Sequence, residues 1–209
     1  MGEAGAIGWI ALPPDDGVAR VGPNAVIRVA EALAEAQGEA VARAVFARAG
    51  LLGWLDQPPA AMVPEADVAA LHRALVETLS EPEARGIAAS AGRRTAAYLL
   101  ANRIPRPVQA VLSLLPGGPS SRILLKAISR HAWTFVGSGT FSVTYGNPVV
   151  VTITGGPLRA AGAAAPGVAA YYAATFEALF RALVSPRSSV TALRRATEAS
   201  AACAFALAW

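Results

Sequence analysis

The stretch from residue 119 to 144 changes its hydrophobic period in the middle, and this change constrains the fold more than any other feature of the chain. After Ala132 the residues are mostly β-branched, aromatic or small, as strands prefer. Before it, apolar residues recur at helical spacing: Ile123, Leu124, Ala127 and Ile128. The pattern predicts a helix that ends near Arg130 and a strand that begins almost at once.

Periodicity and capping signals along the rest of the chain predict an α+β fold. The expected helices cover residues 25–36, 39–49, 65–79, 82–102, 108–115, 120–130 and 168–183. The expected strands cover residues 132–136, 140–145 and 149–154 as a meander, then 189–197 and 202–209 as a final hairpin, with a short strand near 7–12. Residues 155–167, rich in Gly, Ala and Pro, are predicted to form a mobile loop.

These elements predict one antiparallel sheet of about four to five strands, covered on one face by helices. A chain of 209 residues fits a single domain over residues 1–209. Within it we expect an irregular lead-in over 1–22, a mainly helical part over 23–130, and the meander, helix and hairpin over 131–209.

The composition predicts an apolar surface, because 54% of the residues are hydrophobic and only 15% are charged, against about 25% charged in an average soluble domain. A homodimer interface, a pocket for an apolar ligand, or plain helical alanine would each account for the excess. The net charge of +4 comes from scattered arginines without a basic run. That pattern does not favour nucleic-acid binding.

The chemical motifs of common enzymes are missing from the sequence. There is no GxGxxG after a strand, no Walker loop, no HExxH and no CxxC, so no site for a nicotinamide or flavin is readable. The single cysteine, Cys203, excludes an internal disulfide and a multi-thiolate zinc site. The N-terminus lacks the features of a signal peptide, and glycines and prolines interrupt the uncharged run 132–158. We therefore expect a cytoplasmic protein, with peripheral membrane contact left open.

The junction between the predicted helix and strand carries the strongest candidate site. His131, Trp133, Phe135 and the turn 137–139 bring an imidazole, two aromatic faces and flexible backbone within nine residues, which suits a flat, apolar ligand. The alternative is that His131 caps the helix end and the aromatic rings are ordinary core. Ser138 beside His131 does not indicate a hydrolase, because no GxSxG elbow or orienting acid accompanies them.

The run AISRHAWTFVGSGTF at 127–141, together with NRIP at 102–105, LLP at 114–116 and matches at 176–184 and 203–205, resembles the bacteriochlorophyll 4-vinyl reductase family. The resemblance covers about the last 120 residues. It implies a 4-vinyl reductase domain with a Bet3-like α+β fold, and a place in bacteriochlorophyll synthesis acting on divinyl protochlorophyllide or a related magnesium porphyrin. Related domains carry further cysteines, where this chain has Ala169 and Arg195, so a thiolate metal site is not expected and Cys203 is read as a small buried hydrophobe.

The resemblance and the residues together predict a magnesium tetrapyrrole bound between helices and sheet, by a carrier or assembly factor that has no catalytic residue and no metal ligand set of its own. His131 is the candidate axial ligand or hydrogen-bond donor. Four aromatic side chains would contact or stack on the pigment: Trp133, Phe135, Phe141 and Tyr98. Three arginines could pair with its propionates: Arg94, Arg103 and Arg130. The alternative is a vinyl reductase, which alone would require NADPH, and a purely structural adaptor is a third hypothesis. Other bacteriochlorophyll-synthesis enzymes are the expected protein partners, at the photosynthetic membrane if the contact is peripheral.

Overall fold

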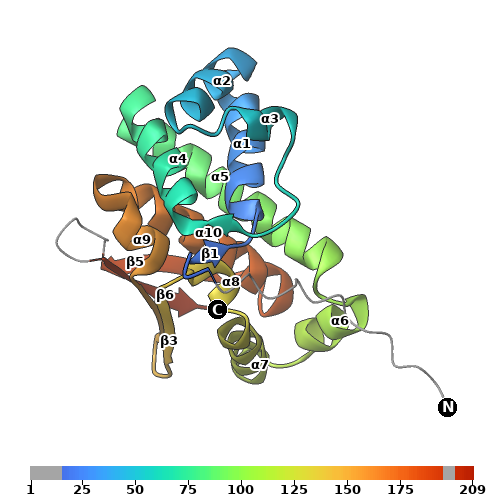
Figure 1. Cartoon of the computed structure of the whole chain (residues 1–209). Coiled ribbons are helices and arrows are strands. Elements are labelled where there is room, and N and C mark those ends of the chain that lie inside the picture. Colours follow the sequence, from blue (N-terminus) through green and yellow to red (C-terminus); the bar gives the residue numbers. More distant parts are fainter. Residues whose placement is uncertain (1–15, 195–200) are drawn as a thin grey trace.

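The computed structural model describes residues 16–194 and 201–209 of the chain (Figure 1). The helical N-terminal half consists of β1 (Arg20–Val21), α1 (Asn24–Gln37), α2 (Glu39–Arg48), α3 (Gly53–Asp56), β2 (Val63–Pro64), α4 (Glu65–Thr78) and α5 (Glu81–Asn102). The C-terminal half consists of α6 (Arg106–Leu114), α7 (Gly117–Arg130), α8 (Trp133–Val136), β3 (Thr140–Thr144), β4 (Val149–Thr154), α9 (Gly156–Ala161), the 3-10 turn η1 (Gly162–Ala164), α10 (Ala165–Leu183), β5 (Ser189–Arg194) and β6 (Ala202–Ala208).

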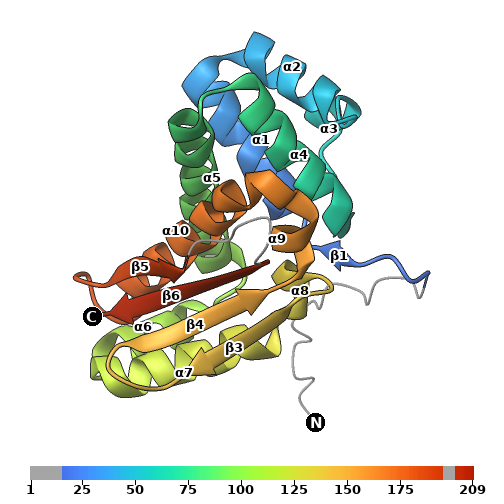
Figure 2. The ribbon, with the colours of Figure 1, turned by 90° about the vertical axis from the view of Figure 1, so that its left-hand side faces the viewer.

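The main sheet has four antiparallel strands in the order β3-β4-β6-β5, and Figure 2 shows its strands beside α6 and α7. Its register pairs Val151 with Phe205 and Ile153 with Cys203, and all four of these residues are fully buried. Along β4 and β6 these buried positions alternate with half-buried ones, as expected where helices cover one face of a sheet. The predicted α+β class, with an antiparallel sheet packed against helices, is confirmed.

The two longest helices, α5 and α10, pack against each other at the centre of the molecule. Gly92 permits this approach, because a Cβ atom there would lie 2.3 Å from the carbonyl oxygen of Tyr171. Two buried polar links cross the contact: the hydroxyl groups of Thr95 and Tyr171 lie 2.7 Å apart, and Thr175 donates to the carbonyl of Gly92 over 3.1 Å. Burial raises the pKa of Tyr171 to about 12, so its hydroxyl stays protonated at neutral pH.

The predicted strand over 132–136 is wrong, because α8 forms there instead. The amide groups of Phe135 and Val136 both donate to the carbonyl of Ala132, over 2.9 Å each, and Gly22 of the N-terminal half donates to the carbonyl of Thr134 over 2.7 Å. These contacts override the strand preference of a short aromatic and β-branched segment. The three-stranded meander is consequently the single hairpin β3-β4, and residues 137–139 link α8 to β3.

The predicted mobile loop over 155–167 is also wrong. It folds into α9, η1 and the first turn of α10, and Leu158, Ala161 and Ala164 are buried in it. Alanine has the highest helix propensity, so the low-complexity composition is compatible with short helices once α4 packs against them. The lead-in 1–22, expected to be irregular, contains β1, which pairs with β2. The strand expected near 7–12 and the end of the one expected over 189–197 lie outside the described residues.

Candidate functional site

The junction residues lie at the end of α7, where the direction of the chain changes. His131 is the C-cap residue of α7, and its Nδ1 lies 2.9 Å from the carbonyl oxygen of Ala127, which fastens the imidazole to the last helical turn. Trp133, in α8, is 36% exposed. The helix-capping role that the sequence left as an alternative for His131 is therefore present in the structure.

Phe135 and Phe141 belong to an aromatic cluster inside the protein. The Phe135 ring lies edge-on to Phe141 at 5.7 Å, to Tyr172 at 6.1 Å and to Phe176 at 6.3 Å between centroids. Tyr172 also donates its hydroxyl to the carbonyl of Phe135 over 2.8 Å. Such edge-to-face pairs stabilise a core. Phe135 acts mainly in packing here, whereas Phe141 is half-buried and also reaches a surface groove.

The Gly137-Ser138-Gly139 turn is held by Glu65, the first residue of α4. The carboxylate of Glu65 accepts hydrogen bonds from the amide of Ser138 over 2.8 Å and from its hydroxyl over 2.7 Å. Gly137 has a φ of 56°, and a Cβ atom there would lie 2.2 Å from that carboxylate. The motif thus joins the two halves of the molecule, and Ser138 is engaged as a structural donor.

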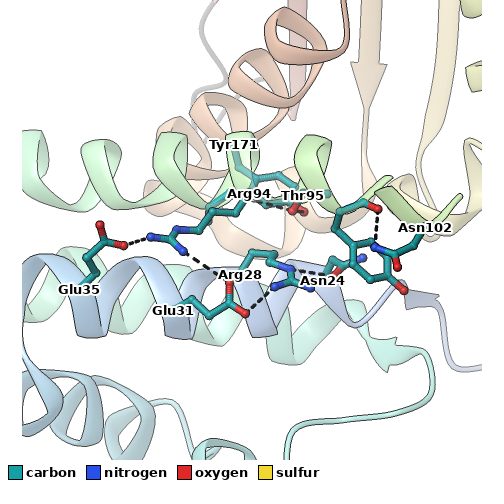
Figure 3. A network of polar contacts seen from close by, with 10 residues as sticks. Asn24, Arg28, Glu31, Glu35, Arg94, Thr95, Asn102 and Tyr171 are labelled. Atoms are coloured by element: carbon teal, nitrogen blue, oxygen red, sulfur yellow. Dashed lines mark hydrogen bonds and ion pairs between the residues drawn. The ribbon is translucent and has the colours of Figure 1, made fainter. Parts of the chain in front are cut away.

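Arg94, a predicted site residue on α5, faces α1 in a network of charged and polar groups (Figure 3). Arg94 forms ion pairs with Glu35 and, at 3.8 Å, with Glu31. The ring of Tyr98 has the guanidinium carbon of Arg28 at 5.0 Å from its centroid and that of Arg103 at 5.9 Å. Arg94 and Tyr98 therefore already have charged partners within the protein.

A shallow surface groove lies between α7 and β3 in the described part of the chain. Its volume is about 570 Å³, and it is largely open to solvent. Small-molecule sites typically measure about 300–1,000 Å³. Residues of α7 and of the β3 hairpin line it: Arg122, Lys126, Ser129, Phe141, Ser142, Val143 and Tyr145.

The groove combines an apolar floor with cationic and hydroxyl groups. Phe141, Val143 and Tyr145 follow one another at alternate positions, so they share one face of the strand and its extension. Arg122 and Lys126 are one helical turn apart on the same side of α7. The guanidinium carbon of Arg122 lies 5.9 Å from the Tyr145 ring centroid. Among the seven lining residues there is no carboxylate, so the charges of the groove favour an anion.

Of the eight site residues predicted from the sequence, Phe141 alone lines this groove. Arg130 continues the row of Arg122 and Lys126 on α7 but is not a lining residue. His131 is not a lining residue of the groove either. The role of its imidazole as an axial ligand stays a prediction.

Sequence reasoning missed Arg122, Lys126 and Tyr145. Two signals pointed to them: the four-residue spacing of the two cations in a predicted helix, and the alternation of Phe141, Val143 and Tyr145 in a predicted strand. What the sequence lacked was the packing of α7 beside β3, which brings these two patterns together.

Metal ligands do not cluster in the part of the chain that the structure describes, where no group of three or more His, Cys, Asp and Glu side chains could hold an ion. Cys203 is fully buried on β6 opposite Ile153, as a small apolar residue would be. The second histidine, His72, is buried in α4, and desolvation lowers its pKa to about 4. Within residues 16–194 and 201–209, none of the helices is both long enough and apolar enough to span a bilayer.

Comparison with known proteins identifies close relatives over nearly the whole chain. The bacteriochlorophyll synthase 23 kDa chain of Rhodobacter capsulatus is 38% identical over 197 residues, which cover 94% of this chain and 91% of that protein. The bacteriochlorophyll synthase 23 kDa chain of Cereibacter sphaeroides is 37% identical over 188 residues, or 90% of each chain. No protein-family model matches the sequence.

These relatives correct the family expected from the sequence. Both relatives are 37–38% identical to this chain over most of its length, and both are named as a synthase chain, not as a 4-vinyl reductase. The identification as a 4-vinyl reductase domain, drawn from motifs in the last 120 residues, is therefore wrong.

Proposed function

Because this chain belongs to the family of the bacteriochlorophyll synthase 23 kDa chain, we propose that it serves bacteriochlorophyll biosynthesis as a carrier or assembly factor for a magnesium tetrapyrrole. The observation that carries the proposal is the groove between α7 and β3, in which cations stand over an apolar, aromatic floor. Tetrapyrrole intermediates are flat apolar rings with carboxylate side chains, so the chemistry of the groove matches both parts of such a ligand.

The lining residues suggest a division of roles. Phe141 and Val143 would contact the ring, and Tyr145 would offer an aromatic face at the end of the hairpin. Arg122 and Lys126 would pair with a free carboxylate of the ligand in charge-assisted hydrogen bonds. The hydroxyl groups of Ser129 and Tyr145 would offer oxygen to the Mg²⁺ of the ligand, directly or through water.

The open shape of the groove supports carriage of the pigment. A groove this open would cover one face of a flat ring and leave the other face accessible, so a second protein could take the pigment from it. The relatives are named as one chain of a synthase, which supports association with other components of bacteriochlorophyll synthesis. A peripheral location at the photosynthetic membrane would place the carrier near lipophilic intermediates.

The proposal is tested by titrating the purified protein with divinyl protochlorophyllide while following pigment absorption and fluorescence. Replacing both groove cations, Arg122→Glu with Lys126→Glu, should weaken binding at least tenfold, since a hydrogen bond to a charged group contributes about 1.5–3 kcal/mol. Arg93→Glu, an exposed α5 position outside the groove lining, is the matched control and should bind as the wild type does.

A second comparison separates the groove from the α7–α8 junction. If the pigment lies in the groove, His131→Ala should leave the affinity within about twofold of wild type. Binding that is lost in His131→Ala and retained in the double groove variant would contradict the groove assignment. No saturable binding by the wild-type protein would contradict the proposed function itself.

A further inference from the structure

The outward side of α6 exposes an apolar surface that the described residues leave uncovered. Val108 is 44% exposed, Val111 57% and Leu114 85%. At about 100° per residue these three positions fall within an arc of about 120° on the helix. We call Val108, Val111 and Leu114 the α6 patch.

The α6 patch is held in place by the rest of the fold. Leu112, on the neighbouring side of the same helix, is buried. The side chain of Gln109 donates to the carbonyl groups of Leu100 and Ile104, over 2.6 and 2.7 Å, and so fixes the corner between α5 and α6. Because α6 cannot turn its apolar side inward without losing these contacts, the exposure of the patch is part of the folded structure.

The charges on α6, on α7 and at the end of α5 before them are of one sign. From residue 103 to 130 there are five cationic side chains and no acidic one, and all five are exposed: Arg103, Arg106, Arg122, Lys126 and Arg130. The acid-free stretch extends from Ala84 to Phe176. Figure 1 shows α6 and α7 side by side at one end of the molecule, so the apolar patch and these cations share that end.

We propose that the α6–α7 end of the molecule docks on a lipid bilayer with anionic headgroups. A helix that presents apolar side chains next to cationic ones lies in the plane of a membrane interface, with its apolar side among the acyl chains and its cations near the headgroups. A second copy of the chain is a poorer occupant, because a two-fold interface would set these like charges against each other. The docking surface rests on the proposed function only for the kind of membrane. Its evidence is α6 and the nearby cations, of which Arg122 and Lys126 also line the groove.

Flotation with lipid vesicles tests the inference. The full-length protein should float with vesicles of phosphatidylcholine mixed with phosphatidylglycerol, and much less with phosphatidylcholine alone or at high salt. Leu114→Ser should lower vesicle binding roughly tenfold, as expected for one leucine leaving an apolar phase. Leu193→Ser is the matched control, since Leu193 of β5 is 57% exposed but lies outside α6, and it should bind like wild type.

Three outcomes would overturn the docking surface: failure of the wild-type protein to float, equal loss in Leu114→Ser and Leu193→Ser, or a dimer in sedimentation that Leu114→Ser dissociates while vesicle binding is absent. Pigment titration of Leu114→Ser should match that of the wild type. Failure of pigment binding would therefore be distinguished from failure of membrane docking.

Discussion

The guanidinium carbon of Arg122 lies 5.9 Å from the centroid of the Tyr145 ring, so a cation of α7 meets an aromatic face at the end of β3 across the groove. Contacts of this kind at exposed sites contribute about 0.5–1 kcal/mol. The pair therefore gives the groove a preferred arrangement of its aromatic and cationic groups without locking it.

Changing Tyr145 separates ring stacking from the hydroxyl group. Tyr145→Phe keeps the aromatic face and should retain pigment affinity within about threefold. Tyr145→Ser removes the face against which both Arg122 and a bound ring could stack, and should weaken binding roughly tenfold, because aromatic pairs contribute about 0.5–1.5 kcal/mol beyond area burial. Fluorescence titration with divinyl protochlorophyllide measures both variants. Equal losses of pigment affinity in Tyr145→Phe and Tyr145→Ser would show that the hydroxyl group, not the ring, contributes to binding.

The close contact of α5 with α10 predicts opposite effects for two glycines of one helix. In Gly92→Ala the new Cβ would meet the Tyr171 carbonyl oxygen at 2.3 Å, so the helices must separate, at a cost of about 3 kcal/mol in unfolding free energy. In Gly86→Ala the Cβ meets no atom within 4 Å, and the substitution should stabilise α5 by about 0.5–1 kcal/mol. Urea unfolding measures both free energies. An unchanged unfolding free energy in Gly92→Ala would argue against the close packing of α5 on α10.

The link between Glu65 and Ser138 should contribute to stability through two hydrogen bonds to a carboxylate. Glu65→Ala removes both acceptors and should lower the unfolding free energy by about 2 kcal/mol, whereas Ser138→Ala removes only the hydroxyl donor and should cost about 1 kcal/mol. Urea unfolding at neutral pH gives both values. The link would have no stabilising role if Glu65→Ala unfolded at the wild-type midpoint.

Burial of His72 predicts a loss of stability in mild acid. Desolvation lowers its pKa from 6.5 to about 4, so the unfolded chain binds the proton more readily than the folded chain does. The contribution of neutral His72 is complete above about pH 6.5 and falls as the pH drops toward 4, by about 2 kcal/mol at pH 5. His72→Gln should lack this component, which unfolding midpoints at pH 7.5 and 5 would show. Asp67, whose pKa is raised by desolvation, titrates in both proteins and cancels in the difference.

The sequence predicted the elements whose period runs long enough to be unambiguous. The apolar positions Phe176, Leu179, Phe180 and Leu183 repeat over several turns of α10, and alternation from Cys203 to Leu207 defines β6. The segment at Trp133–Val136 is too short to show a period, and its strand-like residues adopt a helical turn because the carbonyl of Thr134 is bound by Gly22 from the other half of the chain.

The groove could not be read from the sequence for a similar reason. Each of its walls carries a local pattern, the Arg122–Lys126 spacing and the alternation of Phe141, Val143 and Tyr145, but neither pattern alone encloses a ligand. The aromatic residues at the end of α7 suggested Phe135 as a ligand contact, but its ring packs in the core. Arg94, selected on α5, illustrates the same limit, because its ion pairs with α1 depend on tertiary packing.

The most direct test of pigment binding in the groove between α7 and β3 is to compare the NMR spectra of the protein's methyl groups with and without divinyl protochlorophyllide. A tetrapyrrole ring shifts the resonances of protons stacked near it, so binding in the groove should move the Val143 methyl signals strongly. The signals of Val68, buried in α4 of the helical half, should stay in place. Large shifts confined to residues around Trp133, or to α5 near Tyr98, with Val143 unmoved, would contradict the groove as the pigment site.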